Sequence, residues 1–279
     1  MSTLNAVIVT LTINQFGNTR QDPSITKEIK AVHALAGNAG RWVKNKLPDE
    51  ALKPIQKIAA EARQTAAAIT LPWEDGSRLL PLAARDTYES TMVKLTTRFL
   101  GAVDRLVSDW EFWVEQARIM HNGTFNADDY PSTDKIKDHF RMISIVRPVP
   151  SSSHFDSALR NLYGASLEQD VQERTQKAMQ DLWDRLIAPV AHMASKLADP
   201  DAIFRDSLVV NVQEIINIAP ALNLTNSSQV VEAINRIKSE LAGLDPEVLR
   251  QNKVARRVAS TAAKDIVNSF GRLGSRKFN

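Results

Sequence analysis

The sequence predicts an α+β protein that is mainly α-helical, and three observations support this fold class. Residues 6–13 (AVIVTLTI) and 141–149 (RMISIVRPV) alternate β-branched residues with small or polar ones, which is typical of strands. Most of the remaining chain places apolar residues three, four and seven positions apart, which is typical of amphipathic helices. Only 10 glycines and 12 prolines occur in 279 residues, which favours long regular elements. We therefore expect long amphipathic helices and a small β-sheet built from the N-terminal and mid-chain strands.

Three helices are expected between the two predicted strands. The first begins near Thr26, and the second begins at Asp49, a good N-cap residue, and runs to about residue 69. The segment 71–81 (LPWEDGSRLLP) is bracketed by prolines and contains an Asp-Gly turn signal. The longest periodic stretch follows and predicts one amphipathic helix over 83–120.

After the second strand, the proline- and serine-rich stretch 150–153 is the best candidate linker, and everything beyond it is expected to be helical. Pro189 is expected to kink or break its helix, because proline lacks the N–H that a helix interior needs. The predicted helices cover 155–163, 166–198, 201–218, 227–242 and 246–270. This pattern divides the chain into a mixed α/β region (1–150), a helical region (151–249) and a basic C-terminal helix and tail (250–279).

Several classes of site are disfavoured by what the sequence lacks. It has no cysteine, and its five histidines are scattered without the HxxxH or HExxH spacing of a zinc site. No Walker A motif, dinucleotide fingerprint or GxSxG motif occurs. We therefore expect no enzymatic activity, no catalytic residue, no metal and no cofactor. Two visible strands are too few for an OB-fold, which needs five.

The N-terminus has neither a basic segment nor an apolar run long enough for a signal peptide or a membrane span. The expected location is therefore the cytoplasm, which would be the host cytoplasm if a phage encodes the chain. We also expect a homo-oligomer that makes no contact with membranes.

The positive charge of the chain is concentrated at its C-terminal end. Residues 250–279 carry eight basic residues against the single acid Asp265, a net charge of +7 on a chain whose total is +3. Charge separated in this way suits a polyanion, because phosphate binding is driven by Lys and Arg neutralisation and counterion release. We expect the basic residues of this end to contact nucleic acid: Arg250, Lys253, Arg256, Arg257, Lys264, Arg272, Arg276 and Lys277.

A helical wheel of 246–270 separates this charge from an apolar face. Four cations, Arg250, Lys253, Arg257 and Lys264, share an arc of about 60°, and Arg256 lies nearby. The opposite side is expected to dock on the protein through Val258, Ala262, Ala255, Ile266, Ala259, Phe270 and Ala263. Beyond the helix, Phe278 is expected to stack on a base.

A second basic stretch, residues 18–64, has a net charge of +4, and within it Arg41, Lys44 and Lys46 surround Trp42. Single-stranded nucleic acid is held by this combination, because cations follow the phosphates while an aromatic ring stacks on a base. The alternative for Trp42 is an ordinary place in the hydrophobic core. The intervening region 65–249 has a net charge of −8, which would confine nucleic acid to the two basic regions.

Three segments, LPWEDGSRLLP (71–81), FNADDYPS (125–132) and RPVPSSSHF (147–155), frame the long amphipathic helix. With the size and layout of the whole chain, they resemble the Drc-like family of bacteriophage single-stranded-DNA-binding RNA polymerase cofactors. The resemblance implies a fold other than the OB-fold and preferential binding of single-stranded DNA. It also implies that a phage RNA polymerase is a partner, recruited to locally unwound promoters in transcription regulation. It supplies no residue-by-residue match for the binding site.

A second reading of the same charge pattern remains open. A helical interaction or assembly factor could use its basic tail to dock an acidic protein partner, and helices also often carry a solvated charged face. A virion or scaffolding component is a third possibility for a helical phage protein.

Overall fold

The computed structural model describes residues 4–271, and the fold class predicted from the sequence is confirmed. The chain forms two compact units. Unit 1 combines Met1–Thr10, Ala66–Glu89 and Ile145–Asn279, and unit 2 combines Leu11–Thr65 and Ser90–Ser144. This division differs from the sequence-based one at residues 150 and 249, because unit 1 joins segments from both ends and the middle of the chain.

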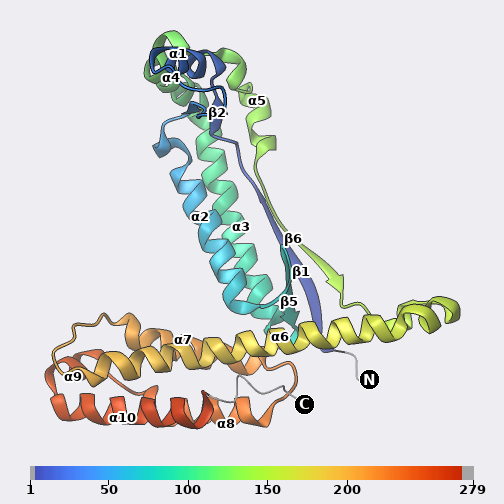
Figure 1. Cartoon of the computed structure of the whole chain (residues 1–279), viewed down its shortest axis with the longest axis vertical. Helices are drawn as coiled ribbons and strands as arrows, with labels where there is room; N and C mark the ends of the chain where they lie inside the picture. The colour runs from blue at the N-terminus through green and yellow to red at the C-terminus, as the bar shows by residue number, and fades with distance from the viewer. Residues whose placement is uncertain (1–3, 272–279) are drawn as a thin grey trace. The chain divides into compact units, whose positions relative to one another are not determined.

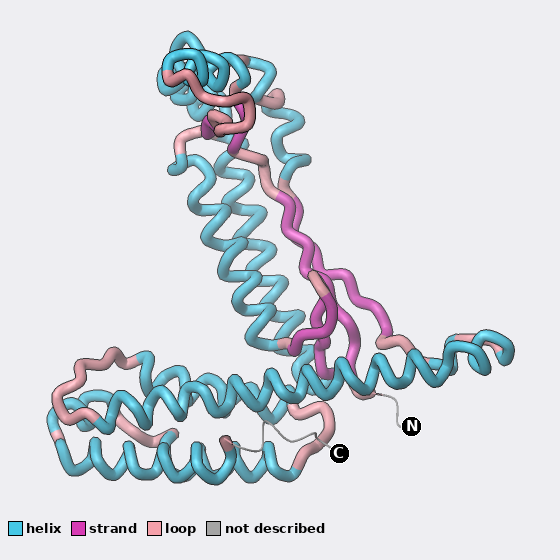
Figure 2. Tube along the Cα trace, in the orientation of Figure 1, coloured by secondary structure: helices cyan, strands magenta, loops and turns pink. Residues whose placement is uncertain are grey.

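The strands form two sheets (Figure 2). The four-stranded sheet has the order β4-β5-β1-β6, and the two expected strands, β1 (Ala6–Asn14) and β6 (Arg141–Pro148), are both in it. Its other members, β4 (Leu71–Glu74) and β5 (Ser77–Pro81), form a hairpin where the sequence indicated only a turn. The turn uses Gly76 at a φ of +76°, a conformation that glycine adopts without strain. The second sheet pairs β2 (Thr19–Gln21) with β3 (Val43–Asn45).

Unit 2 is built around the long helices α2 (Asp49–Ile69) and α3 (Arg85–Ser108), which lie side by side (Figure 1) and continue at their ends into unit 1. Their facing apolar side chains are buried, including Ile55 and Phe99, and Arg98 bonds Glu61 across the helix pair at 2.6 Å. The remaining helices of this unit are α1 (Pro23–Val32), α4 (Trp110–His121) and α5 (Thr133–Ile136).

The single helix expected over 83–120 is therefore two helices, α3 and α4, which are separated at Asp109. The break lets the buried indole of Trp110 donate a hydrogen bond to the carbonyl oxygen of Pro131 at 2.8 Å. A buried indole N–H needs such a partner, so a tertiary contact ends a periodicity that continues in the sequence.

Unit 1 contains a group of packed helices: α6 (Ser157–Ala198), α7 (Ser207–Leu222), α8 (Ser228–Leu241) and α10 (Lys253–Phe270), with the short α9 (Pro246–Gln251) before α10. Helix α6 packs against α7 and α10, and α8 packs against the same two helices (Figure 1). Residues 4–271 also contain the 3₁₀ turns η1 (Leu82–Ala84), η2 (Asn122–Thr124), η3 (Ala127–Asp129), η4 (Lys137–His139) and η5 (Ser152–His154).

Helix α6 is one continuous helix of 42 residues. The sequence-based expectation that the helix ends after residue 163, and that it could break at Pro189, is therefore wrong. Leu186, Val190 and Met193 are buried on both sides of Pro189, and this packing holds the helix together where one backbone hydrogen bond is missing. Gly164 is buried because η5 passes closely over it, and an added Cβ there would lie 3.3 Å from the Arg160 side chain.

The C-terminal helix expected over 246–270 is divided into α9 and α10 at Asn252. The Asn252 side chain accepts hydrogen bonds from the backbone amides of Val254 and Ala255 at 2.9 and 3.0 Å, which is the geometry of an N-cap. Most of the predicted basic face consequently belongs to α10, a helix with its own capped start.

Candidate nucleic-acid interface

Three of the predicted cations are exposed on α10. Lys253, Arg257 and Lys264 all have exposed side chains, as the wheel predicted for the outer face of this helix. Lys253 and Lys264 lie eleven residues apart, which corresponds to about 16 Å along a helix. The opposite face of α10 packs into unit 1 through Ala259, Ala263, Ile266 and Phe270, which are buried.

The buried face of α10 differs in one respect from the wheel. Val258, expected in the docking face, is 64% exposed, while Arg256 is only 6% exposed. The Arg256 guanidinium lies against the end of α6 and the segment that follows it, where its Nη2 donates to the carbonyl oxygens of Lys196 and Ala202 at 3.2 and 2.6 Å. It also lies 5.3 Å from the centre of the Phe204 ring. Arg256 is therefore not part of the exposed basic surface, because the protein's own carbonyls and an aromatic ring hold it inside.

Arg250 is exposed but paired. Its guanidinium bonds Asp206 and Glu247 and lies 5.3 Å from the Phe204 ring centre. These bonds, first that to Asp206, raise the pKa of Arg250 above its ordinary value. Both partner carboxylates compete with a phosphate for this side chain, so it contributes less free positive charge than Lys253, Arg257 and Lys264. We define the exposed cations of α10 as these last three residues.

In unit 2, Trp42 is 46% exposed, so it does not have the ordinary core position that was its alternative. Its backbone is held on both sides: its N–H donates to the Thr26 hydroxyl at 2.9 Å, and its carbonyl accepts from the Asp22 amide at 3.0 Å. A fixed backbone beneath an exposed indole is the arrangement that stacking on a base needs. Arg41, directly before it, is exposed.

Lys44, which the sequence suggested as a phosphate contact, is buried in an ionic cluster. It is 8% exposed, donates to the Thr124 carbonyl at 2.8 Å, and lies 3.4 and 3.7 Å from the carboxylates of Asp129 and Asp22. Arg20 forms a second ion pair with Asp129. Strand pairing between β2 and β3 turns this side chain inward, so Lys44 pairs with the buried Asp129 and the partly buried Asp22 and is not part of the exposed basic surface.

Lys46 is half-buried, and its ammonium group lies 3.8 Å from the centre of the Phe16 ring. Burial, and secondarily the positive charge of Arg20, lower the pKa of Lys46. Because the Lys46 ammonium group already interacts with the Phe16 ring, Lys46 is a weaker candidate for a phosphate contact than Arg41.

Two aromatic features of unit 2 were missed from the sequence. Phe112 on α4 is 55% exposed beside the half-buried Trp113, with ring centres 5.0 Å apart. Phe125 stacks on Tyr130 at 5.1 Å and has the Arg118 guanidinium 4.5 Å from its ring centre. Phe112 and Trp113 are neighbours in the sequence, so their contact is local. The exposure of the two rings depends on which elements pack against α4, and the periodicity of the sequence does not show this.

The predicted residues thus fall into two groups in different units: Lys253, Arg257 and Lys264 in unit 1, and Arg41 with Trp42 in unit 2. The remaining predicted contacts, Arg272, Arg276, Lys277 and Phe278, lie outside the described residues.

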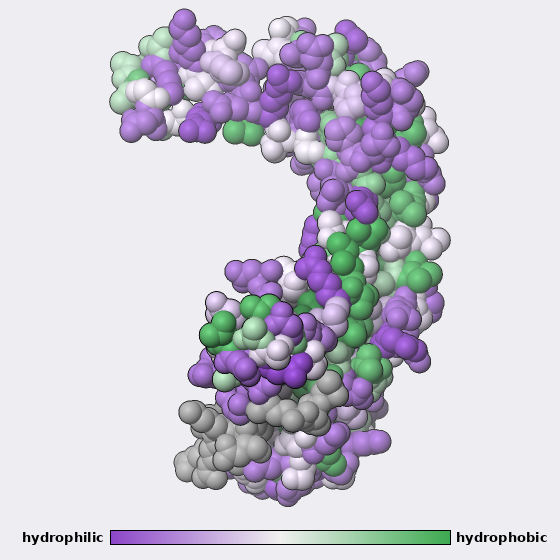
Figure 3. Space-filling model, turned by 90° about the vertical axis from the view of Figure 1, so that its right-hand side faces the viewer, coloured by the Kyte–Doolittle hydropathy of each residue, from purple (hydrophilic) through white to green (hydrophobic). Residues whose placement is uncertain are grey.

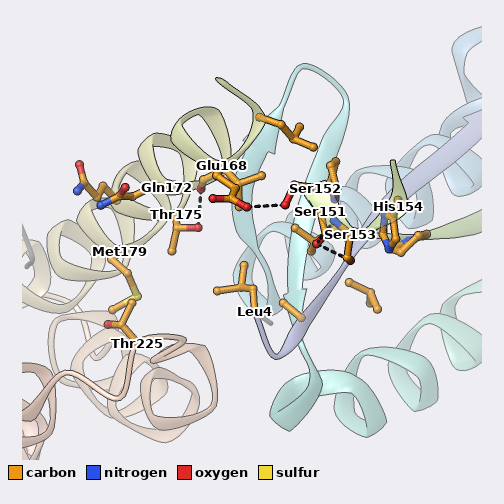
Figure 4. A pocket seen from close by; sticks show the side chains of 18 residues that line it. Leu4, Ser151, Ser152, Ser153, His154, Glu168, Gln172, Thr175, Met179 and Thr225 are labelled. Carbon is orange, nitrogen blue, oxygen red and sulfur yellow. Dashed lines mark hydrogen bonds between the residues drawn. The ribbon is translucent and has the colours of Figure 1, made fainter. Parts of the chain in front are cut away.

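A cavity of about 910 Å³ in unit 1 contains none of these residues (Figure 4). It is lined by the start of β1, the segment after β6 and one side of α6, with as many polar residues as apolar ones, the latter including Leu4, Leu167 and Val171. Glu168 in its lining accepts a hydrogen bond from Ser152, which fastens η5 to α6. None of the described residues that line the cavity is a lysine or an arginine that could hold a phosphate.

Hydrophilic residues predominate on the face shown in Figure 3, with hydrophobic residues exposed among them. Among residues 4–271, no helix is both long and apolar enough to cross a membrane. Within the same range, no three His, Asp or Glu side chains are grouped so that they could hold a metal ion.

Comparison of the chain with protein-family models, curated proteins and solved structures gives no match.

Proposed function

We propose that the protein is a non-enzymatic single-stranded-DNA-binding protein that acts as a transcription cofactor of a bacteriophage. The observation that carries the proposal is the set of exposed cations on α10, Lys253, Arg257 and Lys264, for which the structure gives no ion pair among the described residues. Cations that are exposed and unpaired release counterions when they meet phosphates, and this release drives binding.

The exposed Trp42 indole supports single-stranded over duplex DNA. Bases of a single strand offer open faces to an aromatic ring, whereas those of a duplex are stacked on one another. Recruitment of a phage RNA polymerase to unwound promoter DNA rests on the resemblance to the Drc-like family, and homo-oligomer formation remains a prediction from the sequence.

Substitutions test the proposal better than removal of residues 250–279. Ala259, Ala263, Ile266 and Phe270 of α10 are buried against the rest of unit 1, so a truncation would expose the core and lose binding through unfolding. The decisive variant replaces the exposed cations of α10 by glutamine: Lys253→Gln, Arg257→Gln and Lys264→Gln. Its affinity is compared with that of the wild type for a labelled single strand and for the matching duplex, at two salt concentrations.

The matched control removes the same charge elsewhere in unit 1, with Lys177→Gln, Arg205→Gln and Lys238→Gln, three exposed residues outside α10. The proposal expects wild-type binding from the control and a loss of most single-strand binding from the α10 variant. Equal binding by both variants contradicts it. A variant that keeps single-strand binding but no longer captures an acidic protein partner favours the interaction-factor alternative.

A further inference from the structure

A second cavity of unit 1, of about 480 Å³, lies between the end of α6 and the first two thirds of α10. Four of its lining residues are cationic, and none of the described residues that line it is acidic. Two hydroxyl residues of α10 and three apolar residues at and just beyond the end of α6 complete it. The lining consists of Leu197, Ala198, Pro200, Lys253, Arg256, Arg257, Ser260, Thr261 and Lys264.

Four cationic side chains around one hollow repel one another unless an anion lies between them. A concave site walled by protein also strengthens the field of its charges compared with a flat surface. The acids nearest in sequence to the lining residues are Asp199, Asp201 and Asp265, and none of the three lines the cavity. The cavity therefore favours a ligand with negative charge.

An independent observation is the guanidinium of Arg256. It is 6% exposed, and its Nη2 is bonded to two carbonyl oxygens, but its Nε has no hydrogen-bond partner although it is buried. A buried guanidinium donor without a partner is costly and is commonly satisfied by a ligand or an ion. Arg256 is also one of the residues that line the cavity.

We infer that this cavity is a phosphate-binding pocket, in which Lys253, Arg257 and Lys264 neutralise the charge and a small movement of the Arg256 side chain brings its buried Nε–H to one phosphate oxygen. The inference rests on the proposed function for the source of the phosphate, the backbone of single-stranded DNA. It adds a discrete pocket with a buried donor to what would otherwise be a plain electrostatic surface.

The key variant is Arg256→Lys, which keeps a cation that can reach the carbonyls of Lys196 and Ala202 but removes the Nε–H. Binding of inorganic phosphate is measured by titration calorimetry on the wild type, on this variant and on Lys177→Gln as the control. The same proteins are tested with a single strand, with inorganic phosphate added as a competitor at constant ionic strength.

The wild type and the control should bind inorganic phosphate saturably, and phosphate should displace the single strand more strongly than chloride of the same ionic strength does. Arg256→Lys should weaken phosphate binding about tenfold or more, because a hydrogen bond to a charged group is lost. If Arg256→Lys is not folded, Arg257→Gln decides in its place, since that side chain is exposed and its removal leaves the core intact.

The outcomes separate the inference from the proposed function. A wild type that binds the single strand but not inorganic phosphate, or an Arg256→Lys variant that binds phosphate as the wild type does, overturns the pocket and leaves DNA binding by the surface of α10 in place. A wild type that binds phosphate saturably but no single strand confirms an anion pocket and overturns nucleic acid as its source, and with it the proposed function.

Discussion

The backbone amide of Trp42 donates a hydrogen bond to the hydroxyl oxygen of Thr26 at 2.9 Å. The same hydroxyl donates to the carbonyl oxygen of Asp22 at 2.6 Å, and the Asp22 amide donates to the carbonyl of Trp42 at 3.0 Å. Asp22 in turn caps the start of α1, where its side chain accepts from the Ile25 amide. This closed set of bonds fastens the backbone of Trp42 to the first turn of α1 while its indole remains exposed.

Replacement of Trp42 by alanine should weaken single-strand binding without lowering stability. Loss of one base-stacking ring is expected to cost about 1–3 kcal/mol of binding free energy, or roughly 5- to 150-fold in affinity. Fluorescence anisotropy with a labelled oligonucleotide measures the affinity, and urea unfolding measures the stability. Val43→Ala, at the next exposed position, is the matched control. A Trp42→Ala protein with unchanged affinity would show that the exposed indole serves another contact.

The salt dependence of binding should reveal how many cations of α10 meet phosphates. For single strands, the slope of log K against log salt changes by about 0.7 for each phosphate contact. Removal of Lys253, Arg257 and Lys264 together should therefore make the slope shallower by about 2. The control variant at Lys177, Arg205 and Lys238 should keep the wild-type slope. A slope that changes equally in both variants would indicate a general charge effect and not a contact surface.

Local sequence patterns predicted the secondary structure correctly where the residues of a helix or strand themselves determine where it begins and ends. The alternation in 6–13 and 141–149 identified β1 and β6, and Asp49 marked the start of α2. The errors arose where contacts with residues elsewhere in the chain determine the end of a helix. The helix expected over 83–120 ends at Ser108, and the next helix places the indole of Trp110 where it donates to the carbonyl oxygen of Pro131, 21 positions further along the chain. The periodicity of residues 83–120 does not contain that information.

The candidate site shows the same limit. A helical wheel was sufficient to place Lys253, Arg257 and Lys264 on an outer face, because a helix fixes their relative directions. It could not show that Arg256 lies inside, since that depends on the carbonyls of Lys196 and Ala202. In the sequence, Lys44 is a cation beside Trp42 like Arg41 and Lys46. Its ion-pair partners, Asp22 and Asp129, come from separate parts of unit 2, so the sequence around Lys44 does not reveal them.

Lys44 should matter for stability and not for DNA binding. Lys44→Met leaves the carboxylate of Asp129, which is buried, with Arg20 as its remaining ion-pair partner. Removing one member of a buried ionic cluster is expected to cost about 3 kcal/mol of unfolding free energy. Urea unfolding measures this loss, and binding is compared at temperatures where the variant is folded.

The exposed Arg41 gives the contrast to Lys44. Arg41→Gln should change the unfolding free energy by less than about 0.5 kcal/mol, as is usual for a surface substitution, but should weaken single-strand binding. The opposite result, in which Lys44→Met is stable and binds poorly, would place Lys44 in the interface after all.

Tyr130 should make the stability of unit 2 sensitive to alkaline pH. Its hydroxyl donates to the carbonyl oxygen of Lys46 at 2.6 Å, and burial raises its pKa above the ordinary value of 10.0. The fold therefore favours the neutral phenol. Its contribution to stability is fully present below about pH 10 and is lost as the pH rises through the raised pKa of the folded state.

Tyr130→Phe removes the hydrogen bond and the titrating group together. At pH 7.5 the variant should be less stable than the wild type by about 1 kcal/mol, the usual net value of one hydrogen bond. The difference should narrow when urea unfolding is repeated near pH 11. The lowered pKa of Lys46 has the opposite effect on stability, because loss of its proton at higher pH removes the cost of burying its charge. Both proteins contain Lys46, so this effect cancels in the difference between their unfolding free energies. Tyr163→Phe, at an exposed tyrosine, should show no such change, and a constant gap between wild type and Tyr130→Phe across the pH range would exclude a titrating Tyr130 as the cause.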